Sequence, residues 1–484
     1  MKKFCNLAVL CLFCFALILS SGCSNKASNV AEASTSTEQT AQVRSNAAAQ
    51  QVQISVVGLA QTLDKAKLDA YFDALENNNK FMGSVAVSKN GELMYSRSVG
   101  FVDVQQGLKA NENSKYRIGS ISKTFTAALV LKAVEENKLN LDQTIEKFFP
   151  SLKNADRITI THLLYHRSGV PDFTHGWGSW YTSPKTEREM IEIMAKSGSN
   201  FEPDTKGSYS NSNYLLLSYI LEKIYRKPYS EILKEKIIQP LGLKNTYYGK
   251  KITAKNNECH SYKYVEGWKI QREMDMSIPL GTGGIVSTPI DLNLFSEALF
   301  TGKIISENSL QQMKTLNDQF GMGLIQKRFD AQNGFGHFGG IDGFVANFSY
   351  YPDSGISFAF TANGLNYNDN DQAIATKDIA DAIMSAVYNK PFEIPELTTS
   401  DIADKELDKY LGVYSSKQHP LKVTITKANG KLFGQATGQP AFPCEAIARD
   451  KFEFKRAGII FEFNPSDKTM VLKQGGGVFN FVRE

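Results

Sequence analysis

The sequence lacks a marked excess of charge of either sign. Its 484 residues include 54 Lys and Arg against 50 Asp and Glu, a formal net charge of +4. No run rich in Lys or Arg stands out along the chain. A protein that holds the phosphate backbone of a nucleic acid carries a basic patch or stripe. The charge balance therefore argues against a nucleic-acid partner.

Cysteine is also scarce. Four of the six cysteines stand within the first 23 residues, and only Cys259 and Cys444 lie in the part of the chain that we expect to fold. These two are expected in different domains, so the sequence indicates no disulfide framework.

Long apolar runs are absent except near the N-terminus, where one extends from Leu7 to Leu19. That run is short for crossing a bilayer. Two lysines precede it and small residues follow it, which is the pattern of a secretory signal peptide. Cys23 directly after the small residues resembles a bacterial lipoprotein signal, in which residues 1–22 are removed and Cys23 carries the lipid anchor. We expect an exported protein of the cell envelope, held on its periplasmic or extracellular face; a plain signal peptide cut nearby is the alternative.

Composition divides the remaining chain into four parts. Residues 23–60 are rich in Ala, Ser, Thr, Gln and Asn and have too few large apolar side chains to fold, so we predict a flexible tether. Residues 61–390 should form the main domain, and 391–403 are prone to turns and read as a linker. Residues 404–484 form a separate region of short strand-like runs.

The main domain mixes strands and helices. A hairpin is predicted around Asn90-Gly91, and a buried helix should run from Ser120 to about Asn137. Strands return within 337–363, and a last helix is predicted over 373–388. Strands at both ends with helices between them predict an α+β (mixed) domain, whose one sheet is completed by both ends of the domain. In the C-terminal region, several short strands and the Asn429-Gly430 turn signal predict a small all-β barrel or sandwich.

Three short motifs carry chemistry. Ser120-Ile121-Ser122-Lys123 places a hydroxyl and an amine three residues apart, on one face of a helix. A serine becomes a nucleophile when a neighbouring base takes its proton, and a desolvated lysine can be that base. Tyr209-Ser210-Asn211 and His337-Phe338-Gly339 follow in the order of the second and third elements of the β-lactamases and penicillin-binding proteins.

With these motifs the chain resembles the class C β-lactamase and penicillin-binding serine hydrolase family. The resemblance extends over residues 59–388 and includes the segments 158–171, 239–243 and 283–289. It implies an antiparallel sheet flanked by helices together with an all-helical subdomain. The C-terminal region resembles the lipocalin-like domain appended to many such hydrolases, where it either shapes the cleft or acts as a separate module.

The resemblance also implies the roles of the site residues. Ser120 would attack the acyl carbon and form an acyl-enzyme, and Lys123 and Tyr209 would share the proton transfers, with the choice of base left open. Asn211 would bind the acyl-side amide of the substrate. The backbone N–H groups of Ser120 and Gly340 would form the oxyanion hole.

His337 and Gly339 would line the substrate site as the third element. That element usually begins with lysine, a fixed positive charge near a substrate carboxylate, whereas a histidine is mostly neutral at pH 7. The His-x-Gly form resembles the esterase and D-aminopeptidase branches, so efficient β-lactam hydrolysis is not expected. The predicted function is hydrolysis of an amide or ester, with D-amino-acid peptides of the cell wall as the leading substrate class. An acyltransferase with the same acyl-enzyme, or a binding protein that has lost turnover, are the alternatives.

Structural interpretations of the same residues compete with these roles. Tyr209 could be a core residue, Asn211 a helix cap, and the glycines of the third element simple turn residues. His162 and His166 are four residues apart, but without a third ligand they are more simply packing residues than a metal site. The proposed chemistry needs no cofactor, and the sequence carries no signal for an oligomeric state.

Overall fold

The computed structural model describes residues 63–175, 179–265, 267–366, 375–395, 404–428, 430–448 and 450–484. Cys23, the signal peptide 1–22 and the tether 23–60 lie outside these residues, as does most of the linker.

The main sheet contains strands from both ends of the predicted main domain. Its order is β10-β11-β12-β13-β1-β2, and all of these neighbours are antiparallel. The six strands are β10 (Ile325–Phe329), β11 (Gln332–Ile341), β12 (Phe344–Tyr351), β13 (Ile356–Leu365), β1 (Phe81–Lys89) and β2 (Glu92–Val99). β7 (Tyr262–Tyr264) adds a short parallel pairing to β13, and β8 (Trp268–Ile270) pairs with β7. The predicted α+β sheet completed by both ends is therefore confirmed.

Local sequence explains the hairpin that starts the sheet. Asn90 and Gly91 connect β1 to β2 with φ angles of 48° and 87°, which Asn and Gly tolerate better than other residues. β1 is buried along almost its whole length and pairs with β13 over its full span. A strand covered on both faces needs the continuous apolar and small residues that β1 has.

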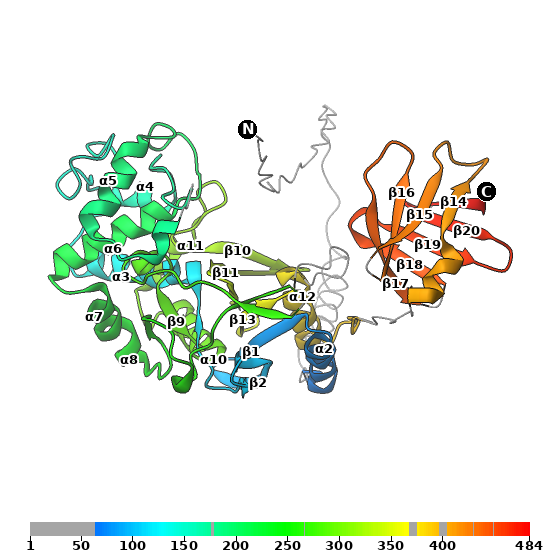
Figure 1. Ribbon diagram of the computed structural model, residues 1–484. Coiled ribbons are helices and arrows are strands. Elements are labelled where there is room, and N and C mark those ends of the chain that lie inside the picture. The colour runs from blue at the N-terminus through cyan, green and yellow to red at the C-terminus, as the bar shows by residue number, and fades with distance from the viewer. Residues whose placement is uncertain are drawn as a thin grey trace, which may run out of the picture. The chain divides into compact units, whose positions relative to one another are not determined.

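Helices cover both faces of the sheet (Figure 1). α2 (Lys65–Asn77) and α12 (Thr376–Val387) pack together on one face, where their apolar side chains join those of β1 and β13 in one buried cluster. α10 (Pro289–Phe300) contacts β1, β12 and β13 from the other face.

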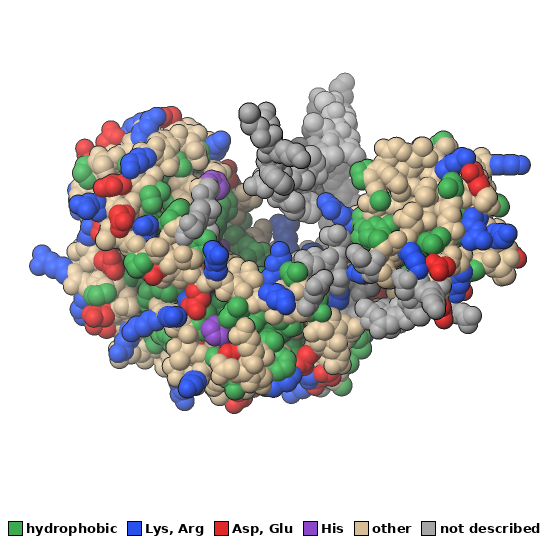
Figure 2. Space-filling view, in the orientation of Figure 1, with side chains coloured by type: hydrophobic (Ala, Val, Ile, Leu, Met, Phe, Trp, Pro, Cys, Tyr) green, Lys and Arg blue, Asp and Glu red, His purple; other side chains and the backbone are tan. Residues whose placement is uncertain are grey.

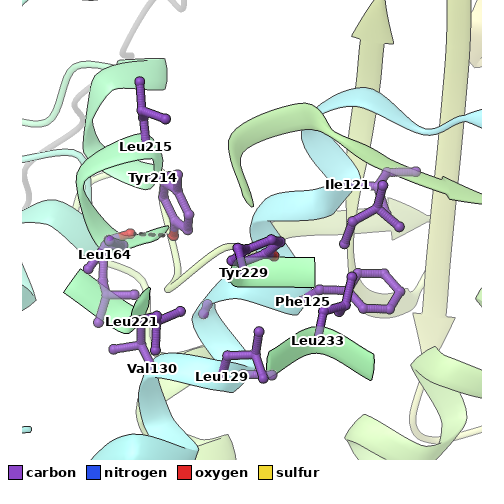
Figure 3. Close-up of a cluster of buried hydrophobic side chains, with 14 of the residues drawn as sticks. Ile121, Phe125, Leu129, Val130, Leu164, Tyr214, Leu215, Leu221, Tyr229 and Leu233 are labelled. Atoms are coloured by element: carbon purple, nitrogen blue, oxygen red, sulfur yellow. Dashed lines mark hydrogen bonds between the residues drawn. The ribbon is translucent and has the colours of Figure 1, made fainter. Parts of the chain in front are cut away.

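The helical part of the domain surrounds α3 (Ser122–Glu135). Every residue from Ser122 to Leu131 is buried, so this helix is enclosed on all sides as its apolar sequence predicts. Figure 3 shows side chains of α3 and its neighbours in this core, where the Tyr214 hydroxyl donates to the Leu164 carbonyl at 2.8 Å. The other helices here are α4 (Ile160–Leu164), α5 (Glu187–Ser197), α6 (Asn211–Tyr225), α7 (Tyr229–Leu233), α8 (Gln239–Leu241), α9 (Leu280–Gly283) and α11 (Glu307–Lys314).

Two small sheets complete this part of the chain. β5 (Tyr116–Arg117), β9 (Ile285–Ser287) and β6 (Tyr247–Tyr248) form one of them in the order β5-β9-β6. It holds the segment that leads directly to Ser120. β3 (Phe101–Asp103) and β4 (Leu108–Lys109) form the other.

The C-terminal region is a closed barrel of eight strands, which confirms the predicted all-β architecture. The strands are β14 (Gly412–Ser415), β15 (Val423–Ala428), β16 (Lys431–Ala436), β17 (Phe442–Ala448), β18 (Lys451–Phe454), β19 (Ile459–Asn464), β20 (Thr469–Gln474) and β21 (Gly477–Arg483). Its core is a separate cluster of buried residues between Leu407 and Phe481. Cys444 lies in that cluster, whereas Cys259 lies in the core around α3.

The surface agrees with the low net charge. Basic and acidic side chains are interspersed over the face that Figure 2 shows. Among the residues that the structure describes, no helix has the length and apolar character needed to span a bilayer.

Candidate active site

Ser120 lies in a single 3-10 turn, Gly119–Ile121, directly before α3. Gly119 has a φ of 52°, a conformation that glycine adopts without strain. A Cβ atom at this position would lie 2.6 Å from the backbone nitrogen of Gly340, closer than real Cβ contacts come. Glycine is therefore required here both for the turn and for the close approach of β11 to the serine.

Lys123 follows in the first turn of α3, and its side chain is fully buried. Its Nζ lies 2.9 Å from Ser120 Oγ, 2.8 Å from Asn211 Oδ1 and 2.8 Å from the Thr282 carbonyl oxygen. Both of the last two oxygens can only accept hydrogen bonds. A neutral lysine would give them its two N–H groups and would turn its lone pair to the Ser120 hydroxyl, which is the geometry of a general base.

Electrostatics favour this neutral form. Burial lowers the pKa of Lys123 to about 7, although the Asp172 carboxylate acts in the opposite direction. Desolvation raises the pKa of the Tyr209 hydroxyl above its ordinary value, so Tyr209 keeps its proton at neutral pH. Of the two candidate bases, Lys123 is therefore the one that can be unprotonated near neutrality.

Tyr209 approaches the serine from the other side. Its hydroxyl donates to Ser120 Oγ at 2.8 Å, and its ring centre is 4.5 Å from that of His166. The residue is 36% exposed, which excludes the interpretation of Tyr209 as a core residue. A serine oxygen that accepts from Tyr209 can donate its own proton to Lys123, so the three groups form one proton chain.

Asn211 is fixed at both ends of its amide. Its Oδ1 accepts from Lys123 and also from Thr282 Oγ1 at 3.2 Å, while its Nδ2 donates to Asp172 Oδ2 at 3.0 Å. A carboxylate only accepts, so this contact sets the orientation of the amide. The contact with Asp172 uses one of the two N–H groups of Nδ2. Asn211 is the first residue of α6, but the N-cap is Ser210, so the helix-cap interpretation is wrong.

His337 stands on β11 in a buried and neutral state. Its Nδ1 lies 2.6 Å from the Phe338 carbonyl oxygen, which can only accept, so Nδ1 carries the proton and Nε2 is the acceptor nitrogen. Burial, with a further contribution from the charge of Lys123, lowers the pKa of His337 to about 3. The third element thus presents a hydrogen-bond acceptor and no fixed positive charge.

The two glycines that follow lie against the nucleophile turn. A Cβ atom on Gly339 would come within 1.9 Å of the Ile118 carbonyl oxygen, so only glycine lets β11 pack here. Gly340 is exposed, and its backbone nitrogen lies beside Gly119. Both glycines belong to a strand, and the interpretation of these two as simple turn residues is therefore wrong.

The paired histidines have packing roles. His162 closes a capping box with Thr159 at the start of α4, and His166 Nδ1 accepts from the Ser210 backbone. Over the described ranges of the chain, no group of three or more His, Cys, Asp or Glu side chains could hold a metal ion.

Sequence reasoning missed two contributors, Asp172 and Thr282. Asp172 directly follows the segment 158–171 that resembles the family, and this position is the signal that could have pointed to it. Thr282 acts partly through its backbone carbonyl, which no side-chain pattern reveals.

Ser120 lies between a buried lysine and a tyrosine, and the glycines of β11 lie beside it. This arrangement defines a serine hydrolase of the acyl-enzyme type. Comparisons with known proteins agree. The model of the family "Beta-lactamase" matches residues 68–382, more than half of the chain. The chain belongs to this family.

Individual relatives are distant in sequence but match over long stretches. The chain is 24% identical to "Penicillin-binding protein 4*" of Bacillus subtilis (strain 168), covering 86% of this chain and 98% of that one. It is 26% identical to "Teichoic acid D-alanine hydrolase" of Staphylococcus aureus (strain MRSA252), covering 67% and 79%. Among solved structures it resembles D-amino acid amidase from Ochrobactrum anthropi SV3, complexed with L-phenylalanine amide, with a TM-score of 0.60 and 26% identity over 66% and 98% of the two chains.

Proposed function

We propose that this protein hydrolyses amides or esters of D-amino acids through an acyl-enzyme on Ser120, with Lys123 as the base. The observation that carries the proposal is the contact of Lys123 Nζ with Ser120 Oγ at 2.9 Å, made by a buried lysine whose pKa is lowered to about 7. A base with a pKa near the working pH is half unprotonated there and still accepts a proton well.

In the acylation step, Lys123 takes the Ser120 proton while the oxygen attacks the acyl carbon. The backbone N–H groups of Ser120 and Gly340 would stabilise the negative oxygen of the tetrahedral intermediate. Tyr209, released from its hydrogen bond to the serine, would give its proton to the leaving group and recover one from the Lys123 ammonium. Water would then attack the acyl-enzyme by the same route in reverse. Asn211 Nδ2 would hold the acyl-side amide.

The third element supports the choice of substrate. A neutral His337 gives a substrate carboxylate no electrostatic attraction, whereas its Nε2 lone pair can accept from a hydroxyl, an amide N–H or an ammonium group. Two relatives whose names describe an action on D-alanine or on D-amino acid amides support the same class. We therefore favour substrates whose leaving group carries no carboxylate.

A substrate panel tests this proposal. Rates on a D-alanine ester, a D-amino acid amide, a D-alanyl-D-alanine peptide and nitrocefin are compared for the wild type and the variant His337→Lys. We expect the wild type to prefer the ester and the amide, and the variant to gain about 10-fold in relative kcat/KM on the two carboxylate-bearing compounds, as one added charge contact allows.

His419→Lys is the matched control, because it makes the same substitution in the C-terminal barrel. Its substrate preference should equal that of the wild type. A wild type that turns over nitrocefin or the dipeptide faster than the ester and the amide would contradict the proposed substrate class.

We further propose that the protein acts in the cell envelope. Support comes from the N-terminal sequence pattern and from relatives whose names describe penicillin binding and an action on teichoic acid. Cys23 would carry the lipid anchor, residues 23–60 would form the tether, and residues 61–390 would form the catalytic domain. Palmitate labelling of the wild type and of Cys23→Ala tests the anchor: a label retained by the variant would contradict it.

A further inference from the structure

Arg117 is a buried arginine that joins three separate segments of the chain. It is 2% exposed, and its Nη1 donates to Asp342 Oδ2 at 2.7 Å and to the Met274 carbonyl at 3.3 Å. Its Nη2 donates to Glu273 Oε2 at 2.8 Å and to the Lys250 carbonyl at 3.0 Å. We call the Arg117–Asp342 pair, with the Met274 backbone that both side chains contact, the arginine clasp.

The two ends of the clasp stand next to the two proposed oxyanion donors. Arg117 ends β5, three residues before Ser120. Asp342 begins the turn between β11 and β12, two residues after Gly340, and has a φ of 55°. The Asp342 side chain also accepts from the Met274 backbone at 2.8 Å, so both of its oxygens are held. The clasp therefore connects the segment of one donor to the segment of the other.

No strand ladder in the described parts of the chain makes this connection. β5 pairs with β9, whereas β11 pairs with β10 and β12. The packing of Gly339 under the Ile118 carbonyl and of Gly340 beside Gly119 brings the two segments together, but these van der Waals contacts fix the position along the strand less sharply than directional hydrogen bonds do. The ion pair, with directional bonds on both partners, can set that position.

Stability alone is a weak reason for a buried ion pair. Removing two charges from water costs free energy that their attraction recovers only in part, and apolar replacements are often as stable. The two carboxylates that contact Arg117 differ in their exposure to solvent. The Glu273 side chain is 25% exposed and borders a cavity of about 640 Å³. The side chain of Asp342 is 1% exposed, and this residue directly follows β11, two residues after Gly340.

We propose that Arg117 and Asp342 are positioning residues, which hold the backbone N–H groups of Ser120 and Gly340 at the separation that the oxyanion requires. This inference rests on the proposed function, because it assumes an acyl-transfer intermediate on Ser120. Neither residue touches the reacting atoms; each acts through the backbone segment that it anchors.

The test compares Asp342→Asn with Glu273→Gln. The second variant is the control, because it removes the other carboxylate partner of Arg117, the one that is more exposed to solvent. One readout is the rate of fluorophosphonate labelling of Ser120. The others are kcat and KM on a p-nitrophenyl ester, with kcat expressed per active site as titrated from the burst phase. The melting temperature is measured in parallel. We expect Asp342→Asn to lower labelling and kcat at least about 10-fold, with KM within about 2-fold of the wild type, because small displacements of oxyanion donors are costly. Glu273→Gln should stay within about 3-fold in both rates.

Asp342→Glu provides a second variant in case the asparagine variant does not fold. It keeps the charge but lengthens the connection by one methylene, so it should also lower kcat about 10-fold while retaining more of the melting temperature. Normal kcat per titrated site in a folded Asp342 variant would overturn the clasp proposal, as would equal rate losses in the Asp342 and Glu273 variants. Failure of the proposed function is distinguishable, because it would leave Ser120 of the wild type itself unlabelled.

Discussion

The buried Lys123 of the proposed active site lowers the free energy of unfolding at neutral pH. An unfolded lysine has a pKa of 10.5, whereas burial lowers that of Lys123 to about 7 in the folded protein. Between these two values the unfolded state binds more protons than the folded state, so the free energy of unfolding rises with pH. At neutral pH the folded protein therefore carries a penalty that an apolar side chain would avoid.

Lys123→Met should remove this penalty. We expect the variant to be inactive but more stable than the wild type at pH 7, by roughly 1–3 kcal/mol after the loss of three hydrogen bonds is allowed for. The increase in stability between about pH 7 and pH 10 should be smaller in the variant. Urea unfolding at both pH values measures this, with the exposed Lys303→Met as control. A variant less stable than the wild type at pH 7, with an unchanged pH slope, would refute the interpretation.

The same pKa predicts the pH dependence of catalysis. The kcat/KM for an activated ester should rise with pH through an inflection near 7 as Lys123 loses its proton, and then level off. Lys123→Arg should lose activity at least about 10²-fold at every pH, because a guanidinium stays protonated and cannot act as base. Stopped assays from pH 5 to pH 9 check both points; an inflection retained in the arginine variant would assign the base to another group.

At this scale the sequence was informative wherever chemistry needs a particular side chain. Ser120, Lys123, Tyr209 and Asn211 were predicted from their motifs, and the structure brings their side chains together. The carbonyl of Thr282 could not be predicted, because every residue type offers one. The choice between Lys123 and Tyr209 depended on burial, which a motif does not encode.

Among the helices and strands, the sequence predicted the first hairpin of the sheet and its strands within 337–363, but it missed β10, β7 and β8. The hairpin at Asn90-Gly91 and the buried helix α3 both agree with the sequence. The start of that helix differs, because Ser120 lies in a separate 3-10 turn and α3 begins at Ser122. The cause is Gly119, whose left-handed conformation allows the contact with β11, and a contact between distant segments leaves no local signal.

Gly119→Ala tests the importance of this turn. The added Cβ would meet the Gly340 backbone nitrogen at 2.6 Å and would also strain the backbone. We expect kcat to fall at least about 10-fold, since the two proposed oxyanion donors would move apart. Gly242→Ala is the matched control, with a φ of 64° and open space around its Cβ. It should cost roughly 1 kcal/mol of stability and leave kcat unchanged. Equal kcat in the two variants would contradict the role of the turn.

At the scale of the whole molecule, the barrel has its own hydrophobic core. Its buried residues all lie between Leu407 and Phe481, and its eight strands close on one another. The sequence predicted an all-β region here, because its short strand-like runs differ from the helical patterns of the main domain. The domain limits 61–390 and 404–484 remain predictions, since burial clusters do not show independent folding.

Two fragments test these limits. A chain of residues 404–484 should fold alone, with a β-type circular dichroism spectrum and a cooperative melt, because it contains a complete core. A chain of residues 61–395 should retain fluorophosphonate labelling of its serine within about 3-fold, because it contains every hydrogen bond given above for the proposed catalytic residues. A barrel fragment without a cooperative melt, or loss of labelling in the longer fragment, would contradict the division.

Peptide mapping by mass spectrometry shows whether Ser120 forms the acyl-enzyme. The protein is incubated with a fluorophosphonate and, separately, with a D-alanine ester under rapid acid quench. We expect an added mass on the peptide that contains Ser120 in both reactions, and no label in Ser120→Ala at equal concentration. A label on another residue, or turnover of the ester by Ser120→Ala at the wild-type rate, would contradict it.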